Sequence, residues 1–400
     1  MRFFLSKPGL ICACGSNPDE FFDSIERGDQ SGIKRITLGK NEDGDDRKFF
    51  VGKIDDSKLK KTGDKYEMRL LQIFQAALDE IAPTVEKAVA KFGRERVGVC
   101  IGSCDNGSEL SLKAHKDFFE NGAFPKEYDL EIQGADYPAS FCAKKFGIKG
   151  LSLAFSTACS SSASAIAKAR ELLQAGMLDA VVCGGVDVAS ETVLLGFGSL
   201  GAVSDEITNP MSRNRHGITL GEGAAVFVLS KEDLDGTGIE LLGAGESSDA
   251  SHMTAPLEDG SGAAAAMESA LKDAGIGADE IDYVNLHATG TKLNDSMEAK
   301  AVDKVFSGRK VPVSGTKPMT GHTLGAAGSL ELAACFLAIE KQKLPIHLND
   351  GAKDEAMPEL NLVRKAETAS EIRTCMSNSF AFGGCNVSLV IGKRNGEECR

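Results

Sequence analysis

Short apolar runs alternate with amphipathic stretches along most of this chain. The apolar runs are bounded by glycine or polar residues and predict strands at 97–101, 151–155, 180–183, 224–229, 281–286 and 386–391. Apolar residues recur at helical spacing in segments between many of these runs, at 68–92, 138–146, 160–175, 262–274, 294–306 and 325–342. This alternation predicts an α/β protein with largely parallel sheets covered by helices.

The order of strand, polar turn and alanine-rich helix occurs twice, over 151–175 and again over 311–339. Both turns consist of small and polar residues, and both precede a helix with Leu or Ile at inward positions. Two similar halves that meet near residue 235 would bring these turns together at one shared pocket. We therefore expect two intimately packed domains, residues 1–235 and 236–400.

Composition narrows the class of protein. The 400 residues are 42% hydrophobic, which is enough for a large core. The net charge of −13 argues against general nucleic-acid binding. The 11 cysteines are odd in number and irregularly spaced, which indicates reduced thiols in a cytoplasmic protein. No apolar run reaches the roughly 18 residues of a membrane span, and the first apolar stretch is too short for a secretory signal.

Cys159 lies at the turn between a predicted strand and a predicted helix, within Ser156-Thr157-Ala158-Cys159-Ser160-Ser161-Ser162. The unpaired amides and the positive end of the helix dipole favour a thiolate at this position. The neighbouring Ser and Thr residues are placed to cap the helix. An isolated cysteine is more often an inert core residue, but the position in the turn favours a nucleophile.

Two histidines stand in similar turns. His287 follows the predicted strand 281–284, where α/β sheets place reactive groups. His322 lies in a glycine-flanked turn, with Lys317 five residues earlier. A buried structural histidine and a surface lysine are the alternative interpretations of His287 and Lys317. Together with Cys159, the histidines supply a nucleophile and two hydrogen-bond donors for covalent catalysis at a thioester carbonyl.

The segment from Ser377 to Asn386 places two phenylalanines beside two glycines, in the order Phe380-Ala381-Phe382-Gly383-Gly384. The glycines predict a tight turn that allows close backbone approach, and the aromatic rings suit a lipid-like chain. A hairpin with two core aromatics explains the same residues equally well.

Two patterns for bound cofactors are rejected. Gly196–Gly201 matches the dinucleotide fingerprint G-x-G-x-x-G, but the residues after it lead toward Asn209-Pro210 and not into a clear long helix. Cys12-x-Cys14 lacks a second pair of ligands, which argues against a zinc site. We therefore expect no metal and no cofactor.

Taken together, these motifs resemble the β-ketoacyl-acyl carrier protein synthases, the elongating condensing enzymes of the thiolase fold. The resemblance extends from about residue 154 to 391 and rests on Thr157-Ala158-Cys159-Ser160, Gly184-Gly185, His287-Ala288-Thr289-Gly290-Thr291, Asn294-Asp295, Thr316-Lys317, Gly321-His322 and Phe380-Ala381-Phe382-Gly383-Gly384. It implies a thiolase-like α/β fold, with two similar βαβ-rich halves in a layered α-β-α-β-α arrangement. The first half would carry the cysteine, and the second both histidines. The initiating class of these enzymes has asparagine in place of the second histidine.

The resemblance also implies an activity. The enzyme would be a 3-oxoacyl-[acyl carrier protein] synthase, an acyltransferase in which Cys159 takes the acyl chain from a carrier protein. His287 and His322 would support decarboxylation of malonyl-carrier protein and stabilise the enolate for the Claisen condensation. Lys317 would orient the site electrostatically, with Asp295 and Glu298 as its neighbours.

Further residues take roles from the same resemblance. The backbone amides of Cys159 and Phe382 would form the oxyanion hole, and Phe380 would gate entry of the malonyl group. Substrate would also contact Thr289, Thr291, Gly383 and Gly384, of which the threonines match positions that touch the pantetheine arm.

The implied partner is an acidic acyl carrier protein, which needs a basic patch on this acidic chain. The best candidate is the segment 58–69, and within it Lys65 and Arg69. A solvated basic turn is the alternative interpretation of this segment. The resemblance also implies a homodimer, or a heterodimer with a chain-length partner.

Some residues depart from the family pattern. Cys385 stands where the family usually has threonine, and Pro210-Met211-Ser212 replaces the usual proline-phenylalanine-aspartate. The acyl substrate therefore stays open, between bulk fatty-acid synthesis and a specialised pathway such as that of an aryl polyene. A thiolase acting on acyl-CoA is one alternative, although thiolases use a second cysteine near the end of the chain as base. A non-catalytic chain-length partner is another, but such subunits lack the nucleophile that Cys159 supplies.

Overall fold

Most of the strands join in one mixed sheet, near whose centre lies the short strand β1 (Phe4–Leu5). The computed structural model describes residues 1–40, 44–105, 107–126, 128–367 and 370–394. Within them the strand order is β13-β12-β11-β14-β15-β10-β1-β9-β7-β5-β6, and β2 pairs with β9. One side of β1 holds β2 (Gly9–Cys12), β5 (Val97–Gly102), β6 (Ser152–Phe155), β7 (Ala180–Asp187) and β9 (Gly223–Ser230). The other side holds β10 (Glu240–Ser248), β11 (Tyr283–Asn285), β12 (Pro312–Ser314), β13 (Asn361–Leu362), β14 (Thr374–Phe380) and β15 (Cys385–Gly392).

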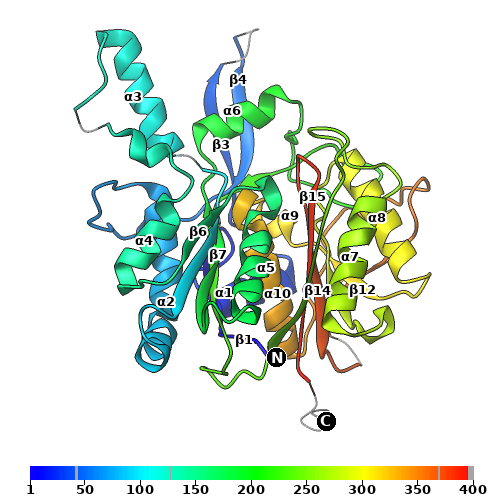
Figure 1. The fold of residues 1–400 in the computed structure, drawn as a ribbon. Coiled ribbons are helices and arrows are strands. Elements are labelled where there is room, and N and C mark those ends of the chain that lie inside the picture. The colour runs from blue at the N-terminus through cyan, green and yellow to red at the C-terminus, as the bar shows by residue number, and fades with distance from the viewer. Residues whose placement is uncertain (41–43, 106, 127, 368–369, 395–400) are drawn as a thin grey trace.

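The helices form three layers around the two sides of this sheet, as Figure 1 shows. Helices α5 (Ser161–Gln174) and α10 (Ala327–Lys341) lie between the two groups of strands and pack against both. Helices α2 (Arg69–Phe92) and α4 (Tyr137–Phe146) cover one outer face, and α7 (Ser261–Ala274) and α8 (Lys292–Val305) cover the other. The predicted α-β-α-β-α layering is confirmed. The predicted boundary near residue 235 falls between β9 and β10, and the division into two domains there stays a prediction.

Strand directions differ from the prediction of largely parallel sheets. The pairs β5–β6, β5–β7, β11–β12, β11–β14 and β12–β13 are parallel, but β7–β9, β10–β15 and β14–β15 are antiparallel. Strands β7 and β9 are buried along their whole length. Their continuous apolar pattern therefore lacks the alternation that marks an antiparallel strand with one solvated face.

The predicted strands and helices all form, with ends shifted by a few residues, but several elements were not predicted. These are α1 (Pro18–Arg27), α3 (Ser108–Asn121), α6 (Glu191–Ser199), α9 (Lys317–Thr320), the strands β1, β2, β10, β13 and β14 of the main sheet, and a small sheet of β3 (Ile33–Lys40), β4 (Asp46–Gly52) and β8 (Leu220–Gly221). Short 3-10 turns are η1 (Asp56–Lys58), η2 (Leu130–Gln133), η3 (Ala158–Ser160), η4 (Ala278–Glu280) and η5 (Leu324–Ala326). Strand β3 is mostly exposed, so it lacks the apolar run by which the predicted strands were recognised.

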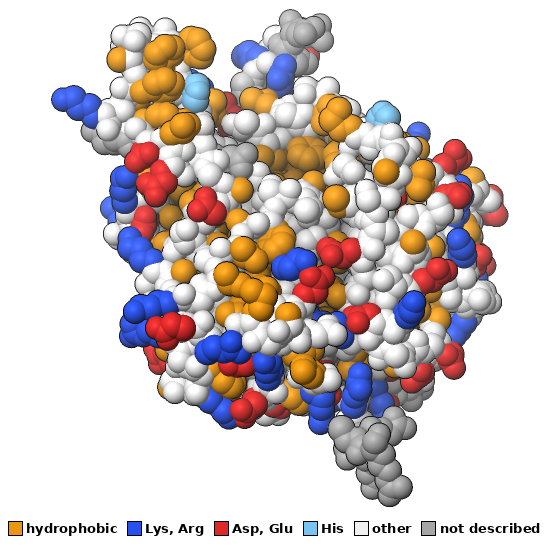
Figure 2. Space-filling model, in the orientation of Figure 1, with side chains coloured by type: hydrophobic (Ala, Val, Ile, Leu, Met, Phe, Trp, Pro, Cys, Tyr) orange, Lys and Arg blue, Asp and Glu red, His pale blue; other side chains and the backbone are white. Residues whose placement is uncertain are grey.

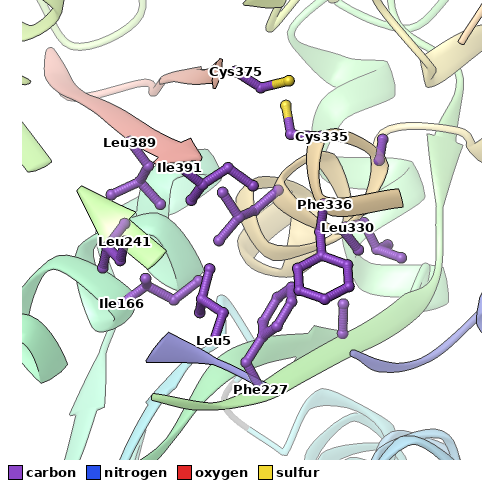
Figure 3. Close-up of a cluster of buried hydrophobic side chains, with 14 of the residues drawn as sticks. Leu5, Ile166, Phe227, Leu241, Leu330, Cys335, Phe336, Cys375, Leu389 and Ile391 are labelled. Atoms are coloured by element: carbon purple, nitrogen blue, oxygen red, sulfur yellow. The ribbon is translucent and has the colours of Figure 1, made fainter. Parts of the chain in front are cut away.

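The main core lies between the central helices and the strands on both sides. Figure 3 shows side chains from α5, α10, β1, β9, β10, β14 and β15 meeting there, with the Phe227 and Phe336 rings 6.1 Å apart. The two central helices approach closely, because a Cβ on Gly328 would lie 2.9 Å from the Cβ of Ala163. The small residues that follow His322 therefore allow the two helices to pack closely. In the part of the chain that the structure describes, no helix has both the length and the apolar surface to cross a membrane.

Candidate active site

Three short turns bring Cys159, His287 and His322 together. Cys159 lies in η3, directly after β6 and before α5, whereas His287 follows β11 and His322 follows α9. Nε2 of His322 is 3.1 Å from Sγ of Cys159. The two imidazole rings lie 5.3 Å apart, centroid to centroid, and nearly perpendicular at 87°. The structure therefore assembles the three residues selected from the sequence, all of them buried.

Each of these turns contains a residue with left-handed backbone that is not glycine. They are Ala158 (φ +52°), Ala288 (φ +40°) and Leu324 (φ +52°), which lie one or two residues from a member of the set. A side chain in this region is held there only when surrounding contacts fix it, and such strain concentrates at functional sites. The fold therefore fixes the three side chains through strained backbone.

The polar residues around Cys159 stabilise the turn and do not cap α5. The Ser161 hydroxyl accepts the amide of Thr157 at 2.9 Å and donates to the carbonyl of Ala158 at 2.6 Å. The Ser160 hydroxyl donates to the carbonyl of Thr157 at 2.8 Å. Among the described residues, no side chain caps the first turn of α5. The predicted capping role was wrong, because these hydroxyls are used to close the turn itself.

The Cys159 thiol is neutral at rest, contrary to the expected thiolate. Burial raises its pKa to about 11, although the Lys317 charge and the backbone N–H of Phe382 both act to lower it. Desolvation of the charged sulfur outweighs these two contributions. The helix terminus alone is too weak to reverse this balance, since a helix dipole contributes about 0.3–1 kcal/mol in ordinary settings.

Both imidazoles are neutral and carry their proton on Nε2. Burial, aided by the Lys317 charge, lowers the pKa of His287 and of His322 well below its usual value. Nδ1 of His322 accepts the amide of Leu324 at 3.3 Å, and Nδ1 of His287 faces the Lys317 ammonium at 3.3 Å. Because Nδ1 acts as the acceptor in each ring, the proton lies on Nε2. Nε2 of His287 is buried and has no hydrogen-bond partner among the described residues.

The carboxylate beside Lys317 is Glu331, and the expected neighbours Asp295 and Glu298 do not contact this lysine. The Lys317 ammonium donates to Oε1 of Glu331 and to the carbonyl of His287. Both members of the ion pair are almost completely buried. Glu331 was missed in the sequence, although it is the one charged residue in the apolar stretch 324–339. A charge at such a position is a signal of a buried partner.

Glu298 and Asp295 hold the backbone of the histidine turn instead. Glu298 accepts the amides of His287 and Ala288, each at 2.7 Å. Asp295 accepts the amides of Met211 at 2.7 Å and of Gly290 at 3.1 Å. Both carboxylates lie in the first half of α8, which faces the amides of the turn. Both lie near the site as expected; among the described residues no hydrogen bond or ion pair joins either of them to Lys317, although the Lys317 charge acts on the Glu298 carboxyl.

The turn after β14 completes the surroundings of the sulfur. The backbone N–H of Phe382 donates to the Cys159 side chain, as an oxyanion-hole donor at this position would. The Phe380 ring lies 6.3 Å from the His287 ring, centroid to centroid. Gly384 lines the cavity described below, whereas the amide of Gly383 donates to the carbonyl of Met253 at 2.7 Å. The two glycines have φ of +88° and +78°, which other residues rarely adopt.

A cavity of about 440 Å³ leads to the three catalytic candidates. Thr289 and Thr291 lie on one wall with their hydroxyls 3.1 Å apart, as the resemblance implies for residues that contact a substrate arm. The opposite wall comes from α6 and the turn after it, with Phe197, Leu200 and Gly201. This wall is the segment that matched the dinucleotide fingerprint. The match was rightly rejected, because two of its glycines lie within α6 and not in a turn between strand and helix.

The two carrier-docking candidates differ in the structure. Arg69 is a structural residue, because its guanidinium donates to the buried carboxylate of Glu222, to Asp56 and to the carbonyl of Ile54. These contacts hold its charge inside the molecule, and its docking role stays a prediction. Lys65 is exposed and pairs with Asp129 at 2.7 Å.

Cys159, His287 and His322 are also a possible set of metal ligands. One ring nitrogen of each histidine and the sulfur lie within 4.8 Å of one another, which no other group of His, Cys and carboxylate side chains in the described residues matches. The proton on each Nε2 opposes metal coordination there, because a ligating nitrogen needs a free lone pair. The arrangement instead offers a thiol nucleophile next to two neutral hydrogen-bond donors.

Comparison with known proteins points to one family over almost the whole chain. The profile of "Beta-ketoacyl synthase, N-terminal domain" matches residues 9–234, and that of "Beta-ketoacyl synthase, C-terminal domain" matches residues 239–350. The 3-oxoacyl-[acyl-carrier-protein] synthase 2 of Vibrio cholerae is 32% identical over 412 residues, which cover 98% of each chain. The mitochondrial 3-oxoacyl-[acyl-carrier-protein] synthase of Arabidopsis thaliana is 36% identical over 74% of this chain and 68% of its own length.

Solved structures of ketosynthases superimpose closely on this chain. The structure of a ketosynthase (ApeO) in complex with its chain length factor (ApeC) from Xenorhabdus doucetiae contains a chain that superimposes with a TM-score of 0.90 at 35% identity, covering 98% of both chains. A chain of the ishigamide ketosynthase/chain length factor superimposes with a TM-score of 0.86 at 27% identity, covering 98% of this chain and 99% of its own. From the profile matches and the identities over almost its full length, this chain belongs to the β-ketoacyl synthase family.

Proposed function

We propose that this chain is a 3-oxoacyl-[acyl carrier protein] synthase that joins a Cys159-bound acyl chain to malonyl-carrier protein with loss of carbon dioxide. The observation that carries the proposal is the placement of one buried thiol beside two neutral imidazoles that present Nε2–H, with His322 at 3.1 Å from the sulfur. Relatives named for this activity match 98% of the chain.

The first half-reaction loads the acyl chain. The Cys159 sulfur attacks the thioester carbonyl of the acyl-carrier protein and loses its proton, and the carrier thiol takes up a proton as it leaves. Negative charge develops on the carbonyl oxygen, where the backbone amides of Cys159 and Phe382 can donate to it. Because the pKa of the free Cys159 thiol is about 11, the sulfur stays protonated until substrate is in place.

The second half-reaction uses both histidines. The thioester carbonyl of the malonyl group accepts hydrogen bonds from Nε2 of His287 and of His322, so the charge left by departing carbon dioxide is held as an enolate. The enolate carbon then attacks the acyl carbonyl on Cys159 and the new carbon–carbon bond forms. As the carbon–sulfur bond breaks, the Cys159 sulfur takes up a proton from solvent and returns to the neutral thiol. Neutral imidazoles suit this step because they donate hydrogen bonds without first taking up a proton.

The alternatives fit the site less well. A thiolase needs a second cysteine as base, and among the described cysteines only Cys159 lines the cavity. A non-catalytic chain-length partner would need no nucleophile, whereas Cys159 is present and fixed by a strained turn.

We also propose that the chain works as a dimer, either with a second copy or with a chain-length partner. Among the described residues β6 is the last strand in the sheet order, so the edge next to Cys159 is open for pairing with another chain. Helix α3 projects from the body and carries exposed aromatics, seen as the orange cluster at the upper left of Figure 2. Phe119 is 82% exposed, and the exposed rings of Phe118 and Phe124 stack 4.7 Å apart. Sedimentation of Phe119→Asp should give a monomer if α3 is part of the interface; an unchanged dimer would exclude α3.

A carrier protein is the proposed substrate donor, and the ten described cysteines, all free thiols, support a cytoplasmic location. The decisive experiment incubates the enzyme with a panel of acyl-carrier proteins and measures intact mass, because the added mass identifies the accepted chain. Malonyl-carrier protein then starts condensation, and the 3-oxoacyl product is measured. Cys159→Ala should neither load nor condense, whereas the matched Cys385→Ala should do both. Loading on Cys159→Ala would refute the proposal.

A further inference from the structure

Cys159, His287 and His322 have the composition of a zinc site as well as of a condensing enzyme. Cysteine sulfur and imidazole nitrogen are preferred Zn²⁺ ligands, and three protein ligands with one open position are typical of catalytic zinc sites. Ligand atoms of a tetrahedral Zn²⁺ lie roughly 3.3–3.6 Å apart, given Zn–N of about 2.0 Å and Zn–S of about 2.3 Å. The three candidate ligand atoms lie within 4.8 Å of one another, so small side-chain rotations would close the set around a metal.

The contacts behind the imidazoles oppose that closure. A metal-ligating nitrogen offers its lone pair, so the proton of the neutral ring must lie on the other nitrogen. The Lys317 ammonium faces Nδ1 of His287 at 3.3 Å, and the amide of Leu324 donates to Nδ1 of His322 at 3.3 Å. Both contacts need a lone pair on Nδ1, and both therefore leave the proton on the nitrogen that a metal would use.

The contact from Lys317 is the stronger obstacle of the two. Its ammonium is charged, buried and held by Glu331 and the carbonyl of His287, whereas the amide of Leu324 is neutral. Oε2 of Glu331 has no hydrogen-bond partner among the described residues and lies 4.0 Å from Nδ1 of His287. A carboxylate behind a ligating histidine accepts the Nδ1 proton in many metal sites. At His287, the lysine prevents this arrangement.

We propose that Lys317 keeps this cysteine–histidine set free of divalent transition metals by fixing the proton of His287 on Nε2. Without the ammonium, Nδ1 can carry that proton and donate it to Glu331, and Nε2 becomes a ligand. Metal binding also uses the Cys159 sulfur and releases the thiol proton to solvent. The inference rests on the donor role proposed above for His287, because the same Nε2 proton serves both purposes.

The test is a Co²⁺ titration of substrate-free protein, followed by the thiolate-to-cobalt charge-transfer absorption. Co²⁺ accepts the same nitrogen and sulfur ligands and reports sulfur coordination directly. Lys317→Met should bind Co²⁺ about 10–100-fold more tightly than the wild-type protein, the range over which partners behind a ligand change metal affinity. Lys317→Arg keeps a buried cation and is the matched control, with an affinity near that of wild type. Adding Cys159→Ser to Lys317→Met should remove the absorption band.

Lys317→Met combined with Glu331→Gln covers the case in which the single variant does not fold, because it leaves no unpaired buried charge. It should bind Co²⁺ more tightly than wild type and less tightly than Lys317→Met. Equal affinity in wild type and in either folded variant overturns the proposal, as does tight binding by Lys317→Arg. The readout needs no substrate, so failure of this proposal and failure of the condensation proposal are separate outcomes.

Discussion

Replacing Glu331 by glutamine removes the carboxylate from a buried ion pair and leaves the Lys317 ammonium without a counter-charge. The two side chains are only 2% and 1% exposed, so water cannot take over the lost interaction. Breaking a buried pair from one side costs about 3–5 kcal/mol. The unfolding entropy of a 400-residue chain is about 0.8 kcal/mol/K, so Tm should fall by about 4–6 °C.

Replacing Lys317, the other member of the ion pair, makes the test sharper. Burial raises the pKa of Glu331 to about 7 even with Lys317 beside it. After Lys317→Met the carboxyl can therefore take up a proton near neutral pH, and Tm should fall by less than in Glu331→Gln. The double variant should recover most of the loss. Scanning calorimetry at neutral pH and one scan rate measures all four proteins. A fall of less than about 1 °C in Glu331→Gln, or an equal fall in both single variants, would refute this reasoning.

Three further predictions concern the site and its partner. Peptide mapping should place the acyl group on Cys159 alone. The alkylation rate of this thiol should still rise near pH 10, because the reactive thiolate forms around its pKa of about 11, and a plateau below about pH 9 would contradict the burial argument. His287→Ala and His322→Ala should each slow malonyl decarboxylation on the order of 10²-fold or more and slow acyl transfer less, and an unchanged rate in His322→Ala would make that residue structural. Lys60 and Lys61 are exposed lysines of the basic segment, and replacing both by Glu should raise KM for acyl-carrier protein in a salt-dependent way. Turnover of a small acyl-pantetheine mimic should stay constant, and equal losses with both substrates would place docking elsewhere.

The catalytic set could be predicted from sequence because its chemistry is local. Cys159, His287 and His322 each stand in a turn of small and polar residues beside an apolar run, and the resemblance to a known family supplied their roles. The layered α/β architecture was likewise visible in the alternation of strands and helices. Both signals lie within short windows of the chain.

The pairing of charges could not be predicted, because it depends on contacts between distant segments. Lys317 meets Glu331 of α10 rather than either carboxylate of α8, and Arg69 turns inward to Glu222, which lies 153 positions away. A basic residue in a basic segment gives no sign of which way its side chain points. The prediction of strand direction was wrong for a related reason. Wholly buried strands such as β7 show the same continuous apolar pattern whether they pair in parallel or antiparallel.

The left-handed residues beside the catalytic set have a consequence for protein engineering. Non-glycine residues in this conformation cost of order 1–3 kcal/mol each, so Ala158, Ala288 and Leu324 lower the stability that the rest of the fold provides. Glycine at Ala158 or Ala288 would relieve that strain and also widen the range of positions open to the neighbouring sulfur or imidazole. Libraries selected for heat resistance alone would therefore enrich changes that relax these turns, and with them variants that keep the fold but condense poorly.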